Sequence, residues 1–326
     1  MKTLRLGRIG VVVYDIEQAK RNYTYMYDIT SWDTQEYAPA QAMSYGREVT
    51  GARWISACGS TGAFTFELVQ PLAGESPFHE HLRTKREGIA FLQVVVDGDP
   101  QAHFRSLGIP VAYTAGERVF YDTRKSLGGF LVEAVPHDVF ADALMPAEPP
   151  TDPALPTDRI FHFGVLVHDV LEALPAYRDV FGITKFDCKT WETGWGRLDA
   201  PQYRGEPVDH GYFTAQGMVG DFGFEIIQSN HGSSHYNREF FDVRGPGIHH
   251  IFPWLAPDDV AWDSVVSRMG ELGYPLCMGS TLRGQAAEFG YFDTFDALGG
   301  YLVEIVVRRR TPEPEFAQPD WVVDYQ

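Results

Sequence analysis

The chain has 326 residues, which is long for one domain and enough for two domains that each bury a core. Hydrophobic residues make up 44% and charged residues 22%, and no apolar run approaches the roughly 20 residues of a membrane helix, so the sequence predicts a soluble protein without a membrane partner. The 27 Lys and Arg against 44 Asp and Glu give a net charge of −17, which repels phosphate backbones and excludes nucleic acid as an expected partner.

The first residues and the cysteines indicate the compartment. Residues 1–8 are basic but lead directly into an apolar alternation, without the long apolar stretch of a signal peptide, so we expect a cytoplasmic protein. Cys58, Cys188 and Cys277 stand far apart and predict neither a disulfide framework nor a thiolate metal site. The sequence leaves the oligomeric state open, with a homodimer as one alternative.

The predicted elements occur twice along the chain. A strand at residues 8–16 (RIGVVVYDI) returns at 162–170 (HFGVLVHDV). Each copy leads into a helix that an aspartate can cap, expected over residues 15–27 and 169–181. A repeat of this length indicates an architecture built from two copies of one unit.

Three further blocks repeat in the same order. They are residues 62–70 with 220–228, 86–91 with 245–250, and 120–133 with 291–304. Matching positions in the four blocks lie 154, 158, 159 and 171 residues apart, so only the loops differ in length. Helices are also expected at 100–107 and 257–272, each followed by paired strands with a Leu-Gly-Gly turn. The sequence therefore predicts an α+β fold of two tandem modules, each made of paired βαβββ units.

The module boundaries follow from proline and charge. Residues 147–157 include a proline-rich run that cannot form a helix or a central strand, and we interpret them as a linker. The first module is then expected at residues 1–146 and the second at 158–310. Residues 311–326 begin with charged and proline-rich sequence and are expected to form an exposed tail that Trp321 docks.

The repeated unit resembles the vicinal-oxygen-chelate superfamily, whose glyoxalase, bleomycin-resistance and dioxygenase members share a cupped mixed sheet. The resemblance covers nearly the whole chain and depends on the first strand, the GIHHI run at 247–251 and the closing LGGYLVE run at 298–304. Residues 224–229, 236–240 and 244–250 look most like the glyoxalase and methylmalonyl-CoA epimerase branch. The two-module length also resembles type I extradiol dioxygenases.

The resemblance implies a metal in the second module, held by His162, Glu225, His250 and Glu304. Two neutral imidazoles and two carboxylates suit one divalent Fe, Mn, Co, Ni or Zn ion, and their summed charge balances it. Four protein ligands on an octahedral ion leave two neighbouring positions for a substrate with vicinal oxygens. No other cofactor is expected.

The first module departs from this pattern. Arg8 stands where His162 stands, and Phe91 stands where His250 stands, so we expect a degenerate site without a metal. The carboxylates Glu67 and Glu133 remain, and we predict that the Arg8 guanidinium bonds both of them in place of the ion. Glu67 and Glu133 lie in runs as apolar as those around Glu225 and Glu304. A purely structural role therefore stays open for both pairs of glutamates.

Three classes of function compete. We expect a metal-dependent lyase or isomerase that transfers a proton on a small, aromatic or apolar substrate with vicinal oxygens. Two features of the sequence argue for this class over a dioxygenase. Glu225 adds a fourth ligand, and no histidine lies between His250 and Glu304. The alternatives are an extradiol-type ring-cleaving dioxygenase and a non-catalytic small-molecule binding or resistance protein. The sequence leaves open the substrate, the metal and the general base.

The candidates for acid–base chemistry are four residues near the predicted site together with one metal ligand. They are His210, Tyr212, His235, Tyr291 and Glu304. His249 is expected not to be a ligand and to face away from the site, because neighbouring side chains of a strand alternate between its two faces.

Overall fold

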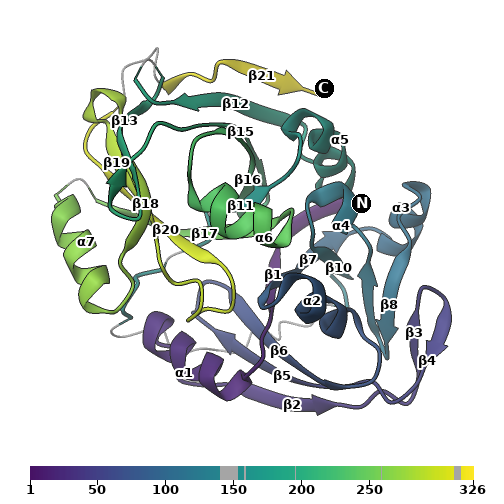
Figure 1. Ribbon diagram of the computed structural model, residues 1–326. Helices are drawn as coiled ribbons and strands as arrows, with labels where there is room; N and C mark the ends of the chain where they lie inside the picture. The colour runs from purple at the N-terminus through teal and green to yellow at the C-terminus, as the bar shows by residue number, and fades with distance from the viewer. Residues whose placement is uncertain (140–152, 158, 195, 258, 312–316) are drawn as a thin grey trace.

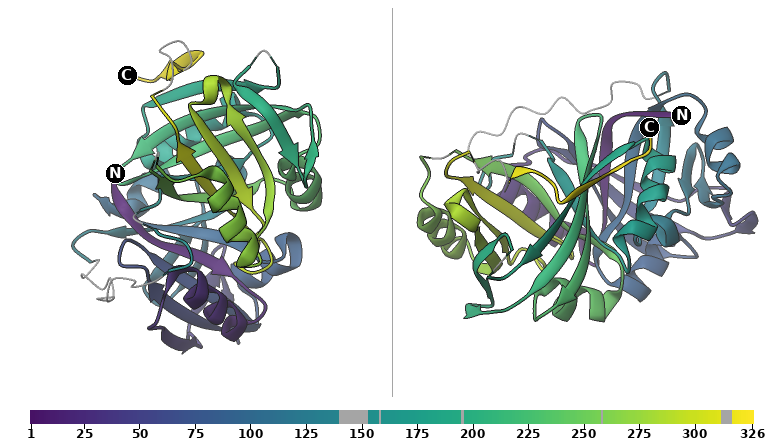
Figure 2. Two further views of the ribbon diagram at one scale, coloured as in Figure 1. Left: turned by 90° about the vertical axis from the view of Figure 1, so that its left-hand side faces the viewer. Right: turned by 90° about the horizontal axis from the view of Figure 1, so that it is seen from above.

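The computed structural model describes residues 1–139, 153–157, 159–194, 196–257, 259–311 and 317–326. Its fold is α+β, as predicted, and consists of two large mixed sheets with few helices (Figure 1). The sheet of the N-terminal half and the sheet of the C-terminal half lie side by side (Figure 2). In the described part of the chain the first sheet has ten strands and the second has eleven.

The first module contains two βαβββ units and some additional short elements. Its strand order is β2-β5-β6-β1-β7-β10-β9-β8-β3-β4. The elements are β1 (Lys2–Val12), α1 (Ile16–Tyr27), β2 (Asp33–Tyr37), β3 (Ala42–Ser44), β4 (Arg47–Val49), β5 (Arg53–Ser60), β6 (Thr65–Ala73), α2 (Pro77–Lys85), β7 (Gly88–Asp97), α3 (Pro100–Ser106), β8 (Val111–Ala115), β9 (Arg118–Tyr121), α4 (Arg124–Leu127) and β10 (Leu131–Pro136).

The second module repeats this plan and adds a strand from the tail. Its strand order is β14-β13-β18-β19-β20-β17-β11-β16-β15-β12-β21. The elements are β11 (His162–Leu166), α5 (Val170–Phe181), β12 (Lys185–Glu192), β13 (Leu198–Tyr203), β14 (Glu206–Pro207), β15 (Gly211–Val219), β16 (Phe222–His231), the π-helix η1 (Tyr236–Phe241), α6 (Asp242–Arg244), β17 (Gly247–Ala256), α7 (Trp262–Glu271), β18 (Leu276–Leu282), the 3-10 helix η2 (Arg283–Gln285), β19 (Ala287–Phe292), β20 (Leu302–Arg308) and β21 (Trp321–Asp324).

The capping predicted for α1 and α5 is confirmed, whereas α7 begins later than predicted. Asp15 and Asp169 accept hydrogen bonds from backbone N–H groups in the first turns of α1 and α5. Helix α7 begins at Trp262, five residues later than expected, because the Val260 N–H closes a separate turn on the carbonyl of Pro257. The turn residues before a helix are hard to distinguish from its first turn by periodicity alone.

The two modules contact each other through matched residues. The hydroxyl of Tyr23 in α1 donates to the carbonyl of Leu298, and that of Tyr177 in α5 donates to the carbonyl of Leu127, both at 2.7 Å. The donors are 154 residues apart and the acceptors 171, which are the offsets of their repeat blocks. The interface is therefore approximately two-fold symmetric within one chain.

The repeated Leu-Gly-Gly turn belongs to this interface. Gly129 and Gly300 have φ values of 99° and 88°, and a Cβ atom on them would lie 2.4 Å from the Pro246 carbonyl oxygen and 2.1 Å from that of Glu87. Only glycine adopts this conformation without strain and also permits so close a backbone approach. The turn is thus repeated because each copy packs against the other module.

Residues 140–152 and 158, which include most of the predicted linker, lie outside the described residues. The module boundaries therefore remain a prediction. In the tail, β21 pairs with β12, and the Trp321 ring stacks on Phe213 with centroids 4.9 Å apart. No helix among the described residues is long and apolar enough to cross a membrane.

Candidate metal centre

Four neighbouring strands of the second sheet bring the predicted ligands together. His162 is on β11, Glu225 on β16, His250 on β17 and Glu304 on β20, and these strands are adjacent in the order β20-β17-β11-β16. Each residue offers one ligand atom, and these atoms all lie within 4.8 Å of one another. The strands come from both halves of the module, so the centre exists only when the module is folded.

The distances within the cluster are short. His162 Nε2 lies 3.3 Å from His250 Nε2, 3.1 Å from Glu304 Oε2 and 3.6 Å from Glu225 Oε2. His250 Nε2 lies 3.4 Å from Glu304 Oε2 and 3.7 Å from Glu225 Oε2. One ion with ligand bonds of about 2.0–2.2 Å separates neighbouring ligand atoms by roughly 2.8–3.6 Å in octahedral or tetrahedral geometry. Four of these five distances fall within this range and the fifth exceeds it by 0.1 Å, so the four donor atoms could hold a single divalent ion.

The electrostatics of the cluster also suit a cation. Burial raises the pKa of Glu225, and the nearby Glu304 charge adds to this effect. Burial acts in the same direction on Glu304, but hydrogen bonds from His162 and His250 outweigh it and lower the pKa of Glu304 to about 2. In the part of the chain that the structure describes, no lysine or arginine pairs with either carboxylate. A bound cation would compensate this buried negative charge.

Gly164 creates the space in which the cluster forms. It pairs with Glu225 on one side and with His250 on the other, so it occupies the middle of the row. A Cβ atom at this position would lie 1.9 Å from Cε1 of the His250 ring. In the first module Gly10 makes the same space for Phe91, with a Cβ contact of 2.0 Å.

His249 is not one of the four cluster residues, as predicted, but the reason given for it, that it faces away from the site, is wrong. The pairing of β11 with β17 shifts between Gly164 and Val165, which leaves His249 unpaired in a β-bulge. A bulge places an extra residue in one strand and interrupts the alternation of side chains. His249 is fully buried and contacts His250, with the two Nδ1 atoms 3.0 Å apart.

The other predicted acid–base residues lie at different distances from the cluster. Tyr291 is the nearest, with its ring centroid 4.8 Å from that of His250 and its hydroxyl 2.6 Å from that of Tyr236. His235 contacts His249 and reaches the centre only through it. His210 contacts the ring of Tyr212 and has no hydrogen bond to the cluster among the described residues. Burial lowers the pKa of His210 to about 4.

Aromatic rings form one wall beside the centre. Tyr212 stacks on Trp191 with centroids 5.9 Å apart and an interplanar angle of 17°. Phe289 contacts both Trp191 and Tyr291. These rings belong to one buried cluster on the second sheet, which also contains Tyr236.

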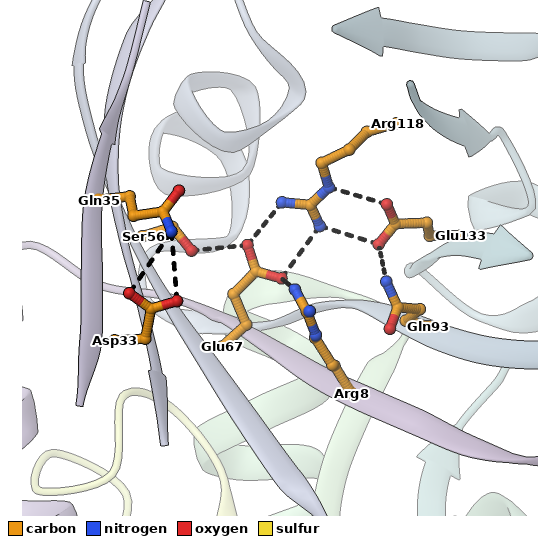
Figure 3. A network of polar contacts seen from close by, with 8 residues as sticks. All are labelled: Arg8, Asp33, Gln35, Ser56, Glu67, Gln93, Arg118 and Glu133. Carbon is orange, nitrogen blue, oxygen red and sulfur yellow. Dashed lines mark hydrogen bonds and ion pairs between the residues drawn. The ribbon is translucent and has the colours of Figure 1, made fainter. Parts of the chain in front are cut away.

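The first module neutralises its carboxylates with a residue that sequence reasoning missed. Figure 3 shows Arg118 between Glu67 and Glu133. Its guanidinium donates two hydrogen bonds to Glu67, of 2.6 and 3.0 Å, and two to Glu133, both of 2.8 Å. Arg8, predicted to bond both carboxylates, only reaches Glu67, at 3.5 Å. The prediction was therefore right about an internal cation and wrong about its main source.

Two residues near the glutamate pairs were missed, Arg118 in the first module and Gln216 in the second, and the strand pattern indicates both. Arg118 is a charged residue two positions before Phe120 in a strand, so alternation places it on the same inward face. Gln216 lies opposite Glu225 in β15 and donates its Nε2 to Glu225 Oε1 at 3.1 Å. It therefore fixes the carboxylate oxygen that does not face the histidines.

Comparison with known proteins supports the fold. No family model matches the chain, and no curated protein matches it. A variant of 4-hydroxymandelate synthase from Streptomyces coelicolor matches with a TM-score of 0.62 and 15% identity over 95% of this chain and 94% of that one. A halotolerant catechol dioxygenase, BphC, matches with a TM-score of 0.50 and 12% identity over 99% and 95%. Together with the doubled βαβββ units, these likenesses show that the chain has the vicinal-oxygen-chelate fold in its two-module form.

Proposed function

We propose that the second module is the active half of a divalent-metal-dependent enzyme, with His162, Glu225, His250 and Glu304 as ligands. The observation that carries the proposal is the convergence of four donor atoms within 4.8 Å at a buried position without a lysine or arginine partner among the described residues. Fe, Mn, Co, Ni and Zn all accept this set of nitrogen and oxygen donors. When bound, the ion supplies Lewis acidity, which stabilises negative charge on two vicinal oxygens of a substrate.

The surroundings of the centre indicate the substrate class. The rings of Trp191, Tyr212 and Phe289 suit a flat or apolar group next to the chelating oxygens. The Lys189 ammonium lies 5.9 Å from the Trp191 ring centroid, and Lys189 pairs with Thr214 in the register of β12 and β15. A cation at this wall favours a substrate that also carries one acidic group. We therefore propose a small aromatic acid with vicinal oxygens.

The two carboxylates are the groups best placed to move a substrate proton. Glu304 Oε2 lies 3.1 Å from His162 Nε2 and 3.4 Å from His250 Nε2. Glu225 has its Oε1 oxygen held by Gln216. We propose that one of these two carboxylates removes and returns the substrate proton, in an isomerisation or elimination that does not consume oxygen.

Metal binding is tested with the full chain and the metals alone. Elemental analysis of protein loaded with Zn²⁺, Mn²⁺ or Fe²⁺ should give about one ion per chain, and His250→Ala should abolish it. His81→Ala is the matched control, because the His81 ring is also buried but belongs to the first module, away from the proposed metal centre. If wild type binds no ion stoichiometrically, or if His250→Ala binds it fully, the assignment of the ligands is wrong.

A second candidate function is an extradiol-type dioxygenase. It is favoured by Tyr291, which lies beside His250 and shares a 2.6 Å hydrogen bond with Tyr236. The likeness to a catechol dioxygenase concerns the fold only at 12% identity. The fourth donor, Glu225, argues against it because one position fewer is left for a catechol and dioxygen together.

One pair of experiments separates the candidates. Catechols and their carboxylated forms are supplied to iron-loaded protein while oxygen uptake is followed. In parallel, α-hydroxy and α-aryl carbonyl compounds are incubated with metal-loaded protein in deuterated water, and the incorporation of deuterium is measured. Proton transfer predicts exchange without oxygen uptake, whereas a yellow ring-cleaved product establishes the dioxygenase. Tight ligand binding without either reaction would establish a non-catalytic binding protein.

A further inference from the structure

Three buried imidazole rings form a chain that leads away from the proposed metal centre. His250 Nδ1 lies 3.0 Å from His249 Nδ1, and His249 Nε2 lies 2.9 Å from His235 Nδ1. All three side chains are at most 1% exposed, so water does not reach these nitrogens. Each contact must then join one protonated nitrogen to one with a free lone pair.

When an ion is bound, the direction of this hydrogen-bond chain follows from its end at the centre, because His250 Nε2 then gives its lone pair to the ion. His250 presents Nε2 to the cluster, where it lies 3.4 Å from Glu304 Oε2. A neutral imidazole that offers a lone pair at Nε2 carries its proton on Nδ1. That proton is donated to His249 Nδ1, so His249 carries its own proton on Nε2 and donates it to His235 Nδ1. The proton of His235 is then on Nε2.

A fixed negative charge lies at the far end of the chain. His235 Nε2 is 3.8 Å from a carboxylate oxygen of Glu239. One oxygen of this carboxylate accepts hydrogen bonds from Arg204 Nε at 2.8 Å and from the Tyr203 hydroxyl at 2.5 Å. The oxygen that faces His235 accepts one from Arg204 Nη2 at 2.5 Å. A carboxylate at this place attracts an N–H group and repels a lone pair, so it favours a proton on His235 Nε2. With an ion bound at His250 Nε2, which lies between that nitrogen and the carboxylates of Glu225 and Glu304, both ends of the chain favour the same direction.

The middle ring is held in place by packing. His249 makes edge contacts with the rings of Tyr236, Phe240 and Tyr291, at centroid distances of 4.8, 5.2 and 5.7 Å. These contacts and the β-bulge leave the ring no room to turn away from His250. In the first module the bulged residue is Ala90 and the next residue is Phe91, so the chain of rings occurs only beside the proposed metal centre.

We propose that His249 and His235 are positioning residues that set the tautomer and the orientation of the His250 imidazole for metal binding, with Glu239 as the charge at the end of the chain. This inference rests on the proposed function, because it needs His250 Nε2 to be a metal ligand. Groups that bond the second nitrogen of a ligating histidine typically change metal affinity by about 10- to 100-fold.

The protonated nitrogens can be observed directly. Full-length protein with ¹⁵N-labelled histidine is loaded with Zn²⁺, and two-bond ¹H–¹⁵N correlations are recorded. We expect protons on Nδ1 of His250, on Nε2 of His249 and on Nε2 of His235. A proton on Nδ1 of His249 or of His235 in the Zn²⁺-loaded protein overturns the proposal and leaves the metal centre intact. If wild type does not bind Zn²⁺, both the proposal and the metal centre fail.

Variants test the same chain by affinity for Zn²⁺ in competition with a chromophoric chelator. His249→Phe keeps a ring but removes both nitrogens and should weaken binding by roughly 10- to 100-fold. His249→Asn supplies an acceptor oxygen near the position of Nδ1 and should recover most of the loss. His81→Phe is the control and should bind as wild type does. Unchanged affinity in His249→Phe together with a loss in His249→Asn would show that the ring acts by packing alone and would overturn the proposal.

His235→Phe keeps the experiment decisive if the His249 variants do not fold. It removes the acceptor for the His249 Nε2 proton and should weaken Zn²⁺ binding, by less than His249→Phe does. The melting temperatures of the metal-free variants show whether they fold. Unchanged Zn²⁺ affinity in a folded His235→Phe protein would overturn the role of His235.

Discussion

Arg118 in β9 and Phe289 in β19 occupy equivalent positions, 171 residues apart in the two modules. The Arg118 guanidinium bridges Glu67 and Glu133, whereas Phe289 is uncharged and leaves the matching pair, Glu225 and Glu304, facing two histidines. Both modules thus bury a pair of glutamates that needs a positive partner. The first module supplies the partner from its own chain, whereas the cluster of the second module could take it from solution as a metal ion.

Replacing Arg118 by Met should destabilise the first module strongly. Glu67 is fully buried and Glu133 is 3% exposed, so both carboxylates would lose their main partner without gaining water. Removing one partner of a buried ion pair typically costs about 3–5 kcal/mol in the free energy of unfolding. Arg8→Met should cost clearly less, because Arg8 makes one 3.5 Å contact and its side chain is 24% exposed. Urea unfolding of both variants measures the difference, and equal losses would contradict this assignment.

The same network should make stability depend on pH. Although burial acts to raise it, the charge and hydrogen bonds of Arg118 lower the pKa of Glu67 in the folded protein. A carboxyl group with a depressed pKa contributes stability that is fully present above its unfolded pKa, near 4.3, and is lost as the pH falls through that value toward the folded one. The stability difference between wild type and Glu67→Gln should therefore be constant at pH 6–7 and shrink below about pH 4.5. A difference that grows with acidity would contradict the prediction.

The sequence predicted the parts of the site that repeat and missed the parts that depend on three-dimensional shape. The four cluster residues could be placed because each belongs to a repeated block, and the absence of a histidine at Arg8 and Phe91 could be seen by comparing the copies. Arg118 was missed because the equivalent position in the second module, Phe289, is uncharged, so comparing the two copies does not single it out.

His249 was placed on the wrong face for a different reason. Strand alternation assumes a regular ladder, and the β-bulge at Gly164 and Val165 is produced by the pairing of β11 with β17. The contact of His235 with His249 joins η1 to β17, which also depends on how the folded chain packs. The residue types were visible in the sequence, but their neighbours were not.

Gly164→Ala should disrupt the metal centre without removing any ligand. The new Cβ would overlap the His250 ring at 1.9 Å, and the ring has no free space because it is fully buried. We expect a loss of metal affinity of at least tenfold and an overpacking cost of about 1–3 kcal/mol in the metal-free protein. Gly270→Ala in α7 is the control, because nothing lies within 4 Å of its added Cβ, and a helical glycine replaced by alanine should be neutral or slightly stabilising. Full metal binding by Gly164→Ala would contradict the role of Gly164 in making space for the His250 ring.

The matched hydrogen bonds of Tyr23 and Tyr177 should stabilise the interface between the modules to similar degrees. Both side chains are fully buried, and their acceptors are the carbonyls of Leu298 and Leu127. Phenylalanine keeps the ring but leaves a buried carbonyl without its donor, which typically costs about 1–3 kcal/mol. Tyr25→Phe is the control in the same helix, since Tyr25 is 51% exposed, and it should change stability by less than about 0.5 kcal/mol. Urea unfolding measures all three, and a Tyr23→Phe or Tyr177→Phe variant as stable as Tyr25→Phe would show that the symmetric contacts do not hold the modules together.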